Sequence, residues 1–293
     1  MKKKNDNIFL LIDGSFHLYR AYYSYPFMVN TEKKPIGAIY GFIYVLNFLI
    51  KKYQPINVAV VFDHKGKTFR NELYEKYKSH RLPMPNELSI QIKPLHDIIQ
   101  AMGIPIISIP GVEADDVIGT IAKLAEFQKK PVLISTADKD MTQLVSNKIN
   151  IFNIINKELI GPKEVEKKYG ITPNFIVDYF ALIGDISDNI PGVPGIGKQR
   201  AKDLIQKFGN IESIYDSIEK FDIYNKNCSN FVFKQLKNHK KIAFLSYQLA
   251  KIKTNVVIKD KYNNFFIRKC DKKRLFFLLK ELNFKKNVIN FLS

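Results

Sequence analysis

Three shortages in the sequence each exclude a class of protein. No run of about 18 consecutive apolar residues occurs along the 293-residue chain, so no membrane span is predicted. The apolar run at residues 8–12 is too short for the core of a signal peptide and is typical of a buried strand. Only two cysteines, Cys228 and Cys270, are present, and neither they nor the five histidines form a metal-binding pattern. These shortages argue against a zinc site and an obligatory disulfide, and favour a reducing cytoplasm.

Positive charge, in contrast, is in large excess. Lysine and arginine total 46 against 28 aspartates and glutamates, which gives a formal net charge of +18. Such an excess favours a polyanionic partner, because binding releases counterions from the polyanion. An AT-rich genome would also enrich every protein in lysine, asparagine and isoleucine, so charge alone leaves an ordinary basic protein possible. The basic residues are spread along the chain and do not locate a site.

Short apolar runs alternate with longer helical patterns in the first part of the chain. The runs at residues 8–12, 58–62 and 131–135 are typical of buried parallel strands. Residues 37–53 and 87–103 have the spacing of helices. This alternation predicts an α/β fold with a parallel-rich sheet.

Helical patterns dominate from about residue 173 onward. They cover residues 173–184, 197–209, 231–249 and 272–284. We therefore expect an N-terminal α/β domain over residues 1–172 and a mostly helical C-terminal region over residues 173–293.

Carboxylates follow the ends of the predicted strands. Asp13 and Asp63 come after the first two strands, and Asp138 and Asp140 follow the third. Because the carboxyl ends of parallel strands meet at one edge of a sheet, these side chains are expected to converge. A single aspartate after a strand is more often a helix cap, but that explanation is poor for a whole set at one edge.

Two further motifs bring the set to nine carboxylates. The motif "VEADD" opens a helix, and "DISD" lies in the helical region; together they supply Glu113, Asp115, Asp116, Asp185 and Asp188. Carboxylates gathered in a small volume raise one another's pKa unless cations bind between them. Oxygen ligands without histidine or cysteine select Mg²⁺ or Mn²⁺, and so many acids suggest more than one ion. Two such ions are a known device for cleaving a phosphodiester.

The motif "GVPGIGK" at residues 192–198 is not a phosphate-binding P-loop. The position after its lysine is Gln199 rather than serine or threonine, and no strand leads into it. A turn that opens a helix fits better. Its backbone N–H groups and the side chains of Lys198, Arg200 and Lys202 can bind successive backbone phosphates without reading bases.

Basic and aromatic residues alternate in the segment 65–85, directly after Asp63. The aromatic members are Phe69, Tyr74 and Tyr77, and the basic ones are Lys67, Arg70, Lys78 and Arg81. Stacking rings beside cations suit single-stranded nucleic acid, whereas an ordinary amphipathic helix would bury the same rings in the core. The position after Asp63 favours a segment that overhangs the acidic edge.

These motifs together resemble a known family. The stretches "LLIDGS", "VVFDHKGKTFR", "YEKYKSHR", "GVEADDVIGT", "STADKDMTQLV" and "LIGDISDNIPGVPGIGKQRA" resemble the 5′ nuclease domain of bacterial DNA polymerase I, which is grouped with phage 5′ exonucleases and flap endonucleases. The resemblance runs from about residue 8 to residue 285. It implies a PIN-like metal-dependent nuclease core, a helical arch at about 65–85 and a helix–multiturn–helix module at about 185–209.

The resemblance also implies roles for individual residues. Asp13, Asp63, Glu113, Asp115 and Asp116 match the acids of one metal, and Asp138, Asp140, Asp185 and Asp188 match the second group, with Asp185 expected to act through water. Lys78, Arg81 and Tyr77 match the catalytic residues of the arch: the two cations contact the scissile phosphate, and Tyr77 occupies the neighbouring aromatic position. The remaining DNA-binding residues are expected to be Arg20, Arg70, Gly192, Gly195, Gly197, Lys198, Arg200 and Lys202, with a K⁺ ion at the glycine-rich turn.

The implied activity is that of a structure-specific 5′→3′ exonuclease and 5′ flap endonuclease. Its expected substrates are DNA with a 5′ flap or end and RNA primers, cleaved by two-metal hydrolysis during replication and repair. A polymerase and a ligase are the expected functional partners of a monomer in the cytoplasm, at the nucleoid. The polymerase relatives continue for several hundred residues, whereas this chain stops at Ser293, so either a stand-alone nuclease or a fragment of a longer polymerase is expected; the ending "KKNVINFLS" favours the stand-alone nuclease. The alternatives are a flap-binding module without catalysis and a PIN-type ribonuclease.

Overall fold

The computed structural model describes residues 8–224, 231–258 and 265–283. Cys228 and residues 284–293 of the expected helical region lie outside this part of the chain. The strands are β1 (Phe9–Asp13), β2 (Asn57–Val61), β3 (Ile106–Ile107), β4 (Val132–Ser135), β5 (Ile149–Asn153) and β6 (Glu158–Ile160). The α-helices are α1 (Gly14–Ser24), α2 (Gly37–Tyr53), α3 (Phe69–Leu73), α4 (Asn86–Ala101), α5 (Ala114–Phe127), α6 (Pro162–Tyr169), α7 (Ile176–Ile183), α8 (Lys198–Phe208), α9 (Ile211–Tyr224), α10 (Phe231–Asn238), α11 (Lys240–Ala250) and α12 (Lys272–Glu281). Three 3₁₀ turns complete the set: η1 (Asp140–Leu144), η2 (Pro173–Phe175) and η3 (Ile186–Asp188).

The strands form one sheet in the order β3-β2-β1-β4-β5-β6, in which only the β5–β6 pair is antiparallel. The central strand β1 is buried along its whole length. Phe9 and Leu11 point into the core on one face of the sheet, and Leu10 and Ile12 into the core on the other. A strand buried on both faces needs apolar residues at every position, which explains the unbroken apolar run.

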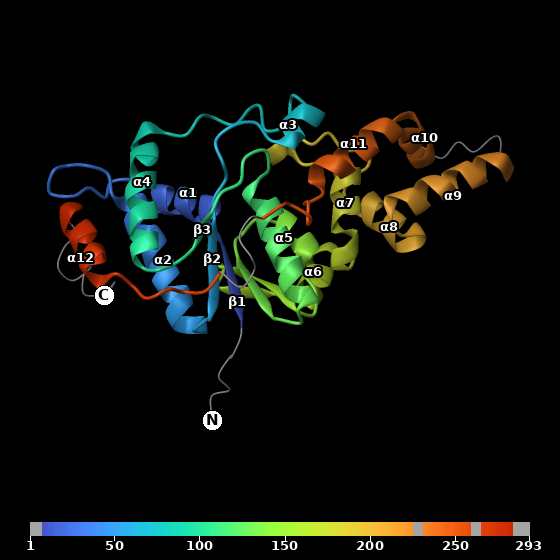
Figure 1. The fold of residues 1–293 in the computed structure, drawn as a ribbon. Coiled ribbons are helices and arrows are strands. Elements are labelled where there is room, and N and C mark those ends of the chain that lie inside the picture. Colours follow the sequence, from blue (N-terminus) through green and yellow to red (C-terminus); the bar gives the residue numbers. More distant parts are fainter. Residues whose placement is uncertain (1–7, 225–230, 259–264, 284–293) are drawn as a thin grey trace.

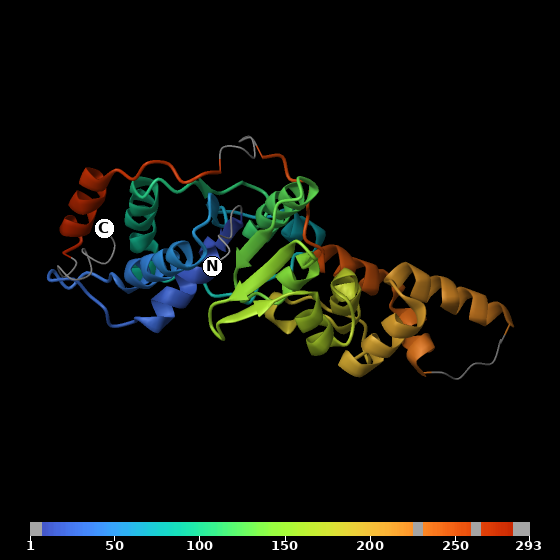
Figure 2. The ribbon, with the colours of Figure 1, turned by 90° about the horizontal axis from the view of Figure 1, so that it is seen from below.

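Helices cover both faces of the sheet, as Figures 1 and 2 show. On one face α1, α2 and α4 contribute Leu18, Phe42 and Ile98 to the core around Leu10. On the other face α5 lies against the strands, and its Ile121 belongs to the core around Phe9. This layered arrangement confirms the predicted α/β class with a parallel-rich sheet.

The helices after residue 170 extend the core on the α5 side. Tyr179 of α7, Leu204 of α8 and Ile214 of α9 all belong to that core. The Asp178 carboxylate accepts a hydrogen bond from the Ile211 backbone N–H at 2.8 Å, which fixes the start of α9. The helix expected over residues 231–249 is two helices, α10 and α11, separated at His239.

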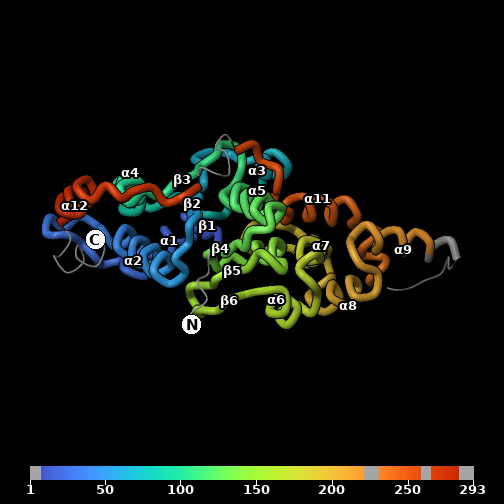
Figure 3. Tube along the Cα trace, turned by 60° about the horizontal axis from the view of Figure 1, so that its bottom comes forward, coloured from blue at the N-terminus to red at the C-terminus, as the bar shows by residue number. Residues whose placement is uncertain are grey.

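The chain then returns to the α/β core. The Val58 N–H donates to the Phe265 carbonyl at 3.1 Å, and the Arg268 N–H donates to the Gly103 carbonyl at 2.8 Å. Leu275 and Leu279 of α12 lie in the same core as α4. Figure 3 shows α12 beside α4, at the opposite end of the molecule from α8 and α9. Residues 265–283 therefore pack on the α/β core, and a domain boundary at 172/173 stays a prediction.

Strands and helices were not all predicted equally well. The three expected strands shift by one residue at most, and the expected helix 37–53 is α2 itself. The strands β5 and β6 and the helices α1, α6 and α9 were missed; β6 is three residues long and largely exposed. The segment 65–85 contains a five-residue helix, α3, followed by turns. Among the described helices, none has the length and apolarity that a membrane span requires.

Candidate active site

Two strand ends place Asp13 and Asp63 at the carboxyl edge of the sheet. Asp13 is the last residue of β1 and caps α1, because its Oδ1 accepts a hydrogen bond from the Phe16 N–H at 2.9 Å. Its Oδ2 accepts a hydrogen bond from the Thr136 hydroxyl at 2.8 Å. Asp63, just beyond β2, accepts a hydrogen bond from the Ala114 N–H at 2.8 Å and so sits at the N-terminus of α5. The fold thereby fixes both carboxylates before any ligand binds.

A pocket of about 450 Å³ opens at this edge. It is lined by acids from four separate stretches of sequence, and by cations: Asp13, Asp63, Glu113, Asp115, Asp138, Arg20, Lys78 and Arg81. Ser15, Phe16, Tyr19, Tyr23 and Ile155 complete its wall. The structure thus brings five of the nine predicted carboxylates to one pocket, together with three of the predicted basic residues.

A second group of acids is Asp140, Asp185 and Asp188, whose carboxylate oxygens lie within 4.8 Å of one another. The Asp140 N–H donates to Asp138 Oδ1 at 2.8 Å, which joins this triad to the acids of the pocket. Asp140 Oδ1 and Asp185 Oδ2 are buried without a hydrogen-bond partner among the described residues. Buried carboxylate oxygens are costly unless they are protonated or bind a cation. An all-oxygen donor set with free buried oxygens fits a hard divalent ion.

Burial and mutual repulsion raise the pKa of several of these carboxyl groups. Burial, with the charges of Asp138 and Asp188, raises the pKa of Asp140 to about 8. Burial also raises the pKa of Asp13 to about 7, although its hydrogen bonds oppose the change. The pKa of Asp115 is raised well above its usual value, again mainly by burial. Such shifts at one place are typical of a functional site.

Lys139 keeps one acid of the triad ionised. Its ammonium lies 2.7 Å from Asp185 Oδ1. Although burial opposes the change, the hydrogen bond from Lys139 lowers the pKa of Asp185. Lys139 and Thr136 were not predicted as site residues. Lys139 had a detectable signal, because it is a cation between Asp138 and Asp140 in the sequence.

Lys78 and Arg81 connect the two groups of acids. The Lys78 ammonium lies 2.7 Å from Glu113 Oε1 and 3.5 Å from Asp188 Oδ2. Arg81 Nη2 lies 2.6 Å from Asp188 Oδ1. Although burial lowers it, Glu113 and other nearby groups raise the pKa of Lys78 well above its usual value, so the side chain stays charged. A phosphate that entered the pocket would meet these two cations and Arg20 on its wall.

Tyr77 is buried, with 3% of its surface exposed. Its hydroxyl lies within hydrogen-bond distance of Glu113 Oε2 at 3.0 Å and of Asp188 Oδ2 at 3.3 Å. The prediction that this ring stacks on nucleic acid is therefore wrong, because the ring belongs to the core. Tyr77 contacts the acids through its hydroxyl instead.

Arg70 and Asp116 are corrections to the predicted site. Arg70 is 2% exposed and forms a bidentate ion pair with Asp116, which is fully buried. Arg70 is therefore not a DNA contact. Both Asp116 oxygens accept hydrogen bonds from Arg70, so this carboxylate is committed to a structural pair and does not line the acidic pocket.

The glycine-rich turn lies beyond η3 and leads into α8. Gly192 has a φ of 63°, and a side chain there would meet the Gly184 backbone N at 2.3 Å. Gly197 is the N-cap of α8. Lys198 and Arg200 are exposed, and Arg200 Nη1 donates to the Gly195 carbonyl at 2.6 Å. Among the other predicted DNA contacts, Lys202 is half-buried in α8 and Arg20 lines the acidic pocket.

Known proteins resemble the chain along nearly its whole length. Family models of a 5'-3' exonuclease N-terminal resolvase-like domain and a 5'-3' exonuclease C-terminal SAM fold match residues 8–170 and 171–273. A 5'-3' exonuclease of Buchnera aphidicola subsp. Acyrthosiphon pisum is 44% identical, over 96% of this chain and 98% of its own. DNA polymerase I of Pseudomonas aeruginosa is 41% identical, over 94% of this chain but 30% of its own.

Solved structures agree on the fold. The 5'-exonuclease of T5 with bound zinc ions superposes with a TM-score of 0.68 at 21% identity, over 98% of this chain and 100% of its own. The catalytic core of Rad2 in complex with a DNA substrate reaches 0.66 at 19% identity, over 98% of this chain and 91% of its own. Both family models match in order, and the Buchnera exonuclease is similar over nearly the full length of both chains. The chain therefore belongs to the 5'-3' exonuclease family.

Proposed function

We propose that this protein is a structure-specific 5′→3′ exonuclease and 5′ flap endonuclease that hydrolyses phosphodiesters with bound divalent ions. The observation that carries the proposal is the convergence of carboxylates from β1, β2, α5 and the segment after β4 at one pocket, beside the triad of Asp140, Asp185 and Asp188. Membership of the 5'-3' exonuclease family supplies the polarity of the reaction. The T5 and Rad2 relatives, which share the fold, include complexes with DNA.

The acids are the proposed ligands of two Mg²⁺ ions, for which Mn²⁺ substitutes. The triad holds one ion, and the acids that line the pocket hold the other: Asp13, Asp63, Glu113, Asp115 and Asp138. When bound, such ions neutralise the carboxylates and stabilise negative charge that develops on a phosphate during hydrolysis. The unpartnered buried oxygens of Asp140 and Asp185 support this assignment.

The cations of the pocket are the proposed contacts to the scissile phosphate. Lys78 and Arg81 reach the acids from the segment after α3 and offset charge on the phosphate in the transition state. Arg20 of α1 lines the same pocket. These three side chains orient the strand to be cut.

The turn between η3 and α8 is the proposed binding site for the DNA duplex. Lys198 and Arg200 are exposed at the start of α8, where backbone N–H groups and positive charge favour a phosphate. Such contacts recognise the shape of DNA rather than its sequence. A K⁺ ion at the turn formed by residues 192–197 is part of the same proposal.

The substrates are DNA with a 5′ single-stranded flap or end, and RNA primers paired to DNA. A polymerase that creates flaps and a ligase that seals the remaining nick are the functional partners. The protein acts as a monomer in the cytoplasm, at the nucleoid.

A cleavage assay on labelled substrates tests the proposal. Wild type with Mg²⁺ is expected to release short 5′ products from a 5′-flap duplex, and EDTA abolishes the release. A matched 3′-flap duplex and an unstructured RNA serve as controls. Binding of the flap without cleavage would favour the non-catalytic module, and faster cleavage of the unstructured RNA would favour the ribonuclease.

A further inference from the structure

Arg70 lies at the centre of a buried network that joins three distant parts of the chain. Its two terminal nitrogens, Nη1 and Nη2, donate to the oxygens of Asp116 at 2.7 and 2.8 Å. Its Nε donates to the Leu249 carbonyl and its Nη2 to the Lys251 carbonyl, each at 2.9 Å. Arg70 belongs to α3, Asp116 to α5, and the two carbonyls to residues 249–256, which we call the strap.

The strap is anchored to the core at further points. The Lys253 N–H donates to Asp116 Oδ1 at 2.8 Å, and the Val256 N–H donates to the Thr120 hydroxyl at 3.1 Å. Both anchors are side chains of α5, the helix that begins beside Glu113. The first two residues of the strap form the end of α11, so the strap connects α5 directly to the helical region.

A second anchor lies behind the aspartate triad. Gln143 Oε1 accepts a hydrogen bond from the Ile252 N–H at 2.9 Å, and its Nε2 donates to the Ala250 carbonyl at 3.0 Å. The same Nε2 donates to the Asp140 carbonyl at 2.9 Å. The strap therefore contacts residues that support both groups of acids.

Arg70 reaches the acids through Glu113. Its Nη1 lies 3.1 Å from Glu113 Oε2, the oxygen that also lies 3.0 Å from the Tyr77 hydroxyl. The Lys78 ammonium donates to the other oxygen of Glu113, Oε1. Glu113 is thus held on one oxygen by a buried guanidinium, whose own position is set by Asp116 and the strap.

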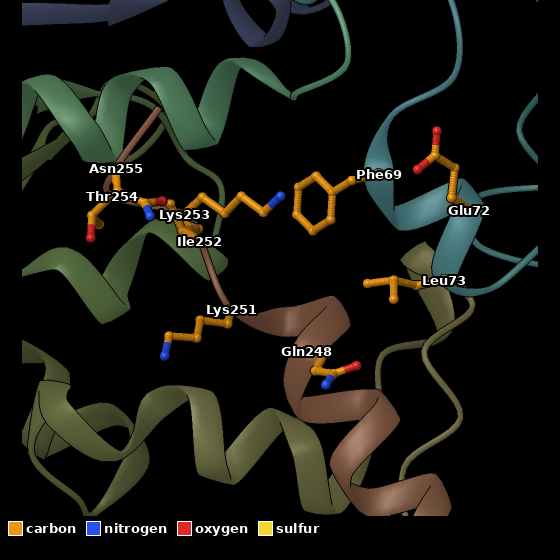
Figure 4. A pocket seen from close by; sticks show the side chains of 9 residues that line it. All are labelled: Phe69, Glu72, Leu73, Gln248, Lys251, Ile252, Lys253, Thr254 and Asn255. Carbon is orange, nitrogen blue, oxygen red and sulfur yellow. The ribbon is translucent and has the colours of Figure 1, made fainter. Parts of the chain in front are cut away.

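A cavity of about 710 Å³ separates α3 from the strap (Figure 4). Across it the Lys253 ammonium lies 3.3 Å from the centre of the Phe69 ring. Leu73 of α3 and Gln248 of α11 also line the cavity. The hydrogen bonds of Arg70 and the contact between Lys253 and Phe69 thus connect α3 to the strap.

We infer that Arg70, paired with Asp116 and bound to the strap, is a positioning residue for divalent-ion binding at the acidic pocket. It orients Glu113 and links that acid to the helical region through the strap. The inference rests on the proposed function, because it assigns Glu113 to an ion. Groups that orient metal ligands from behind typically affect metal affinity or activity about 10–100-fold.

The test uses the double variant Arg70→Gln/Asp116→Asn. Removing both charges together avoids leaving one buried charge unpaired, which would destabilise the fold by itself. Titration calorimetry is expected to show Mn²⁺ affinity lowered about 10–100-fold, and kcat on a 5′-flap duplex is expected to fall by a similar factor. Affinity for the flap duplex in Ca²⁺ is expected to change about twofold or less, because Arg70 is buried. The single variant Arg70→Lys keeps the charge and Asp116, and its Mn²⁺ affinity is expected to lie between those of the double variant and the wild type.

Several outcomes would overturn the inference. Mn²⁺ affinity equal to that of wild type would remove the positioning role, and so would a loss of duplex affinity as large as the loss of kcat. A double variant without a cooperative unfolding transition would show that the pair serves the fold instead. Arg274→Gln, at an exposed arginine of α12, is the matched control and is expected to leave all readouts unchanged. Calorimetry needs no cleavage, so failure of the proposed activity would show separately, as wild type that binds Mn²⁺ and leaves the flap intact.

Discussion

The Lys78 ammonium lies 2.7 Å from Glu113 Oε1, although the two residues are 35 positions apart in the sequence. The same ammonium lies 3.5 Å from Asp188, so one lysine touches an acid from each group. Lys78 has a φ of 52°, and its N–H donates to the Asp188 carbonyl at 3.0 Å, which holds the backbone in this left-handed conformation. Its position at the junction of the two groups makes it the most informative cation to change.

Lys78→Ala is expected to reduce kcat much more than duplex affinity. Loss of a preorganised charge that stabilises a transition state costs about 10²–10³-fold in kcat. Binding of the flap duplex in Ca²⁺ is expected to weaken about threefold or less, because other cations remain on the DNA-binding surface. Single-turnover kinetics and fluorescence anisotropy measure the two quantities. Equal losses in both would contradict the assignment, and Lys123→Ala on α5 is the matched control.

Asp140→Asn is expected to stabilise the metal-free protein while abolishing cleavage. The pKa of Asp140 is raised to about 8, so at pH 9 its ionised form is held in unfavourable surroundings. Removal of that charge is expected to raise the free energy of unfolding in EDTA at pH 9 by about 1–2 kcal/mol. Urea denaturation measures it, with the exposed Asp216→Asn as control. A destabilised variant, or one that still cleaves in Mg²⁺, would contradict the assignment.

The stability of the metal-free protein is expected to fall as pH rises from 7 to 9. Folded-state pKa values of about 7 for Asp13 and about 8 for Asp140 lie above those of unfolded aspartate, so the folded protein binds more protons. The stability that these two protonated groups contribute is fully present below the pKa of the unfolded chain and is lost as pH rises through the folded-state pKa. Between pH 7 and 9 the free energy of unfolding is expected to fall by about 1 kcal/mol per pH unit. His17, whose pKa burial lowers to about 3, is neutral in the folded protein over this window and mostly neutral in the unfolded chain, so it adds little slope.

Urea denaturation at pH 7, 8 and 9 in EDTA measures this slope. The same series in excess Mg²⁺ is expected to be flatter, because bound cations favour the ionised carboxylates. Stability in EDTA that stays level or rises between pH 7 and 9 would show that the acids do not repel one another as the structure indicates.

Gly192→Ala is expected to destabilise the turn that leads to α8. Gly192 has a φ of 63°, and a methyl group there would lie 2.3 Å from the Gly184 backbone N, so the backbone itself must move. We expect a loss of more than about 1 kcal/mol in unfolding free energy and weaker duplex binding, with Mn²⁺ affinity unchanged. Gly197→Ala is the matched control for the unfolding free energy alone, because its φ is −92° and no atom lies within 4 Å of the added carbon. Equal effects of the two substitutions would argue against a close backbone contact.

The sequence predicts those parts of the fold whose burial is uniform. β1 is apolar at every position because both faces are buried, and α2 carries an uninterrupted helical pattern from Gly37 to Tyr53. β6 escapes prediction because it has three residues, is largely exposed, and depends on its pairing with β5. The break between α10 and α11 at His239 carries no glycine or proline signal.

The acids of the site could be predicted because strand ends converge, whereas the burial of Arg70 could not. Arg70 binds the carbonyl of Lys251, 181 residues later, and Asp116 accepts a hydrogen bond from Lys253, 137 residues later. In the sequence, an arginine within a basic and aromatic segment is typical of a DNA contact. Only the fold shows that the strap buries it. For the same reason, alternating rings and cations could not reveal that Tyr77 points inward.

The anomalous scattering of Mn²⁺ in crystals of the wild-type protein tests the central claim most directly. Divalent ions are expected among Asp140, Asp185 and Asp188, and in the pocket lined by Asp13, Asp63, Glu113, Asp115 and Asp138. Anomalous peaks at both places would support the two-ion site. Crystals equilibrated with excess Mn²⁺ that show no peak at either group of acids would contradict the assignment of a metal-dependent nuclease.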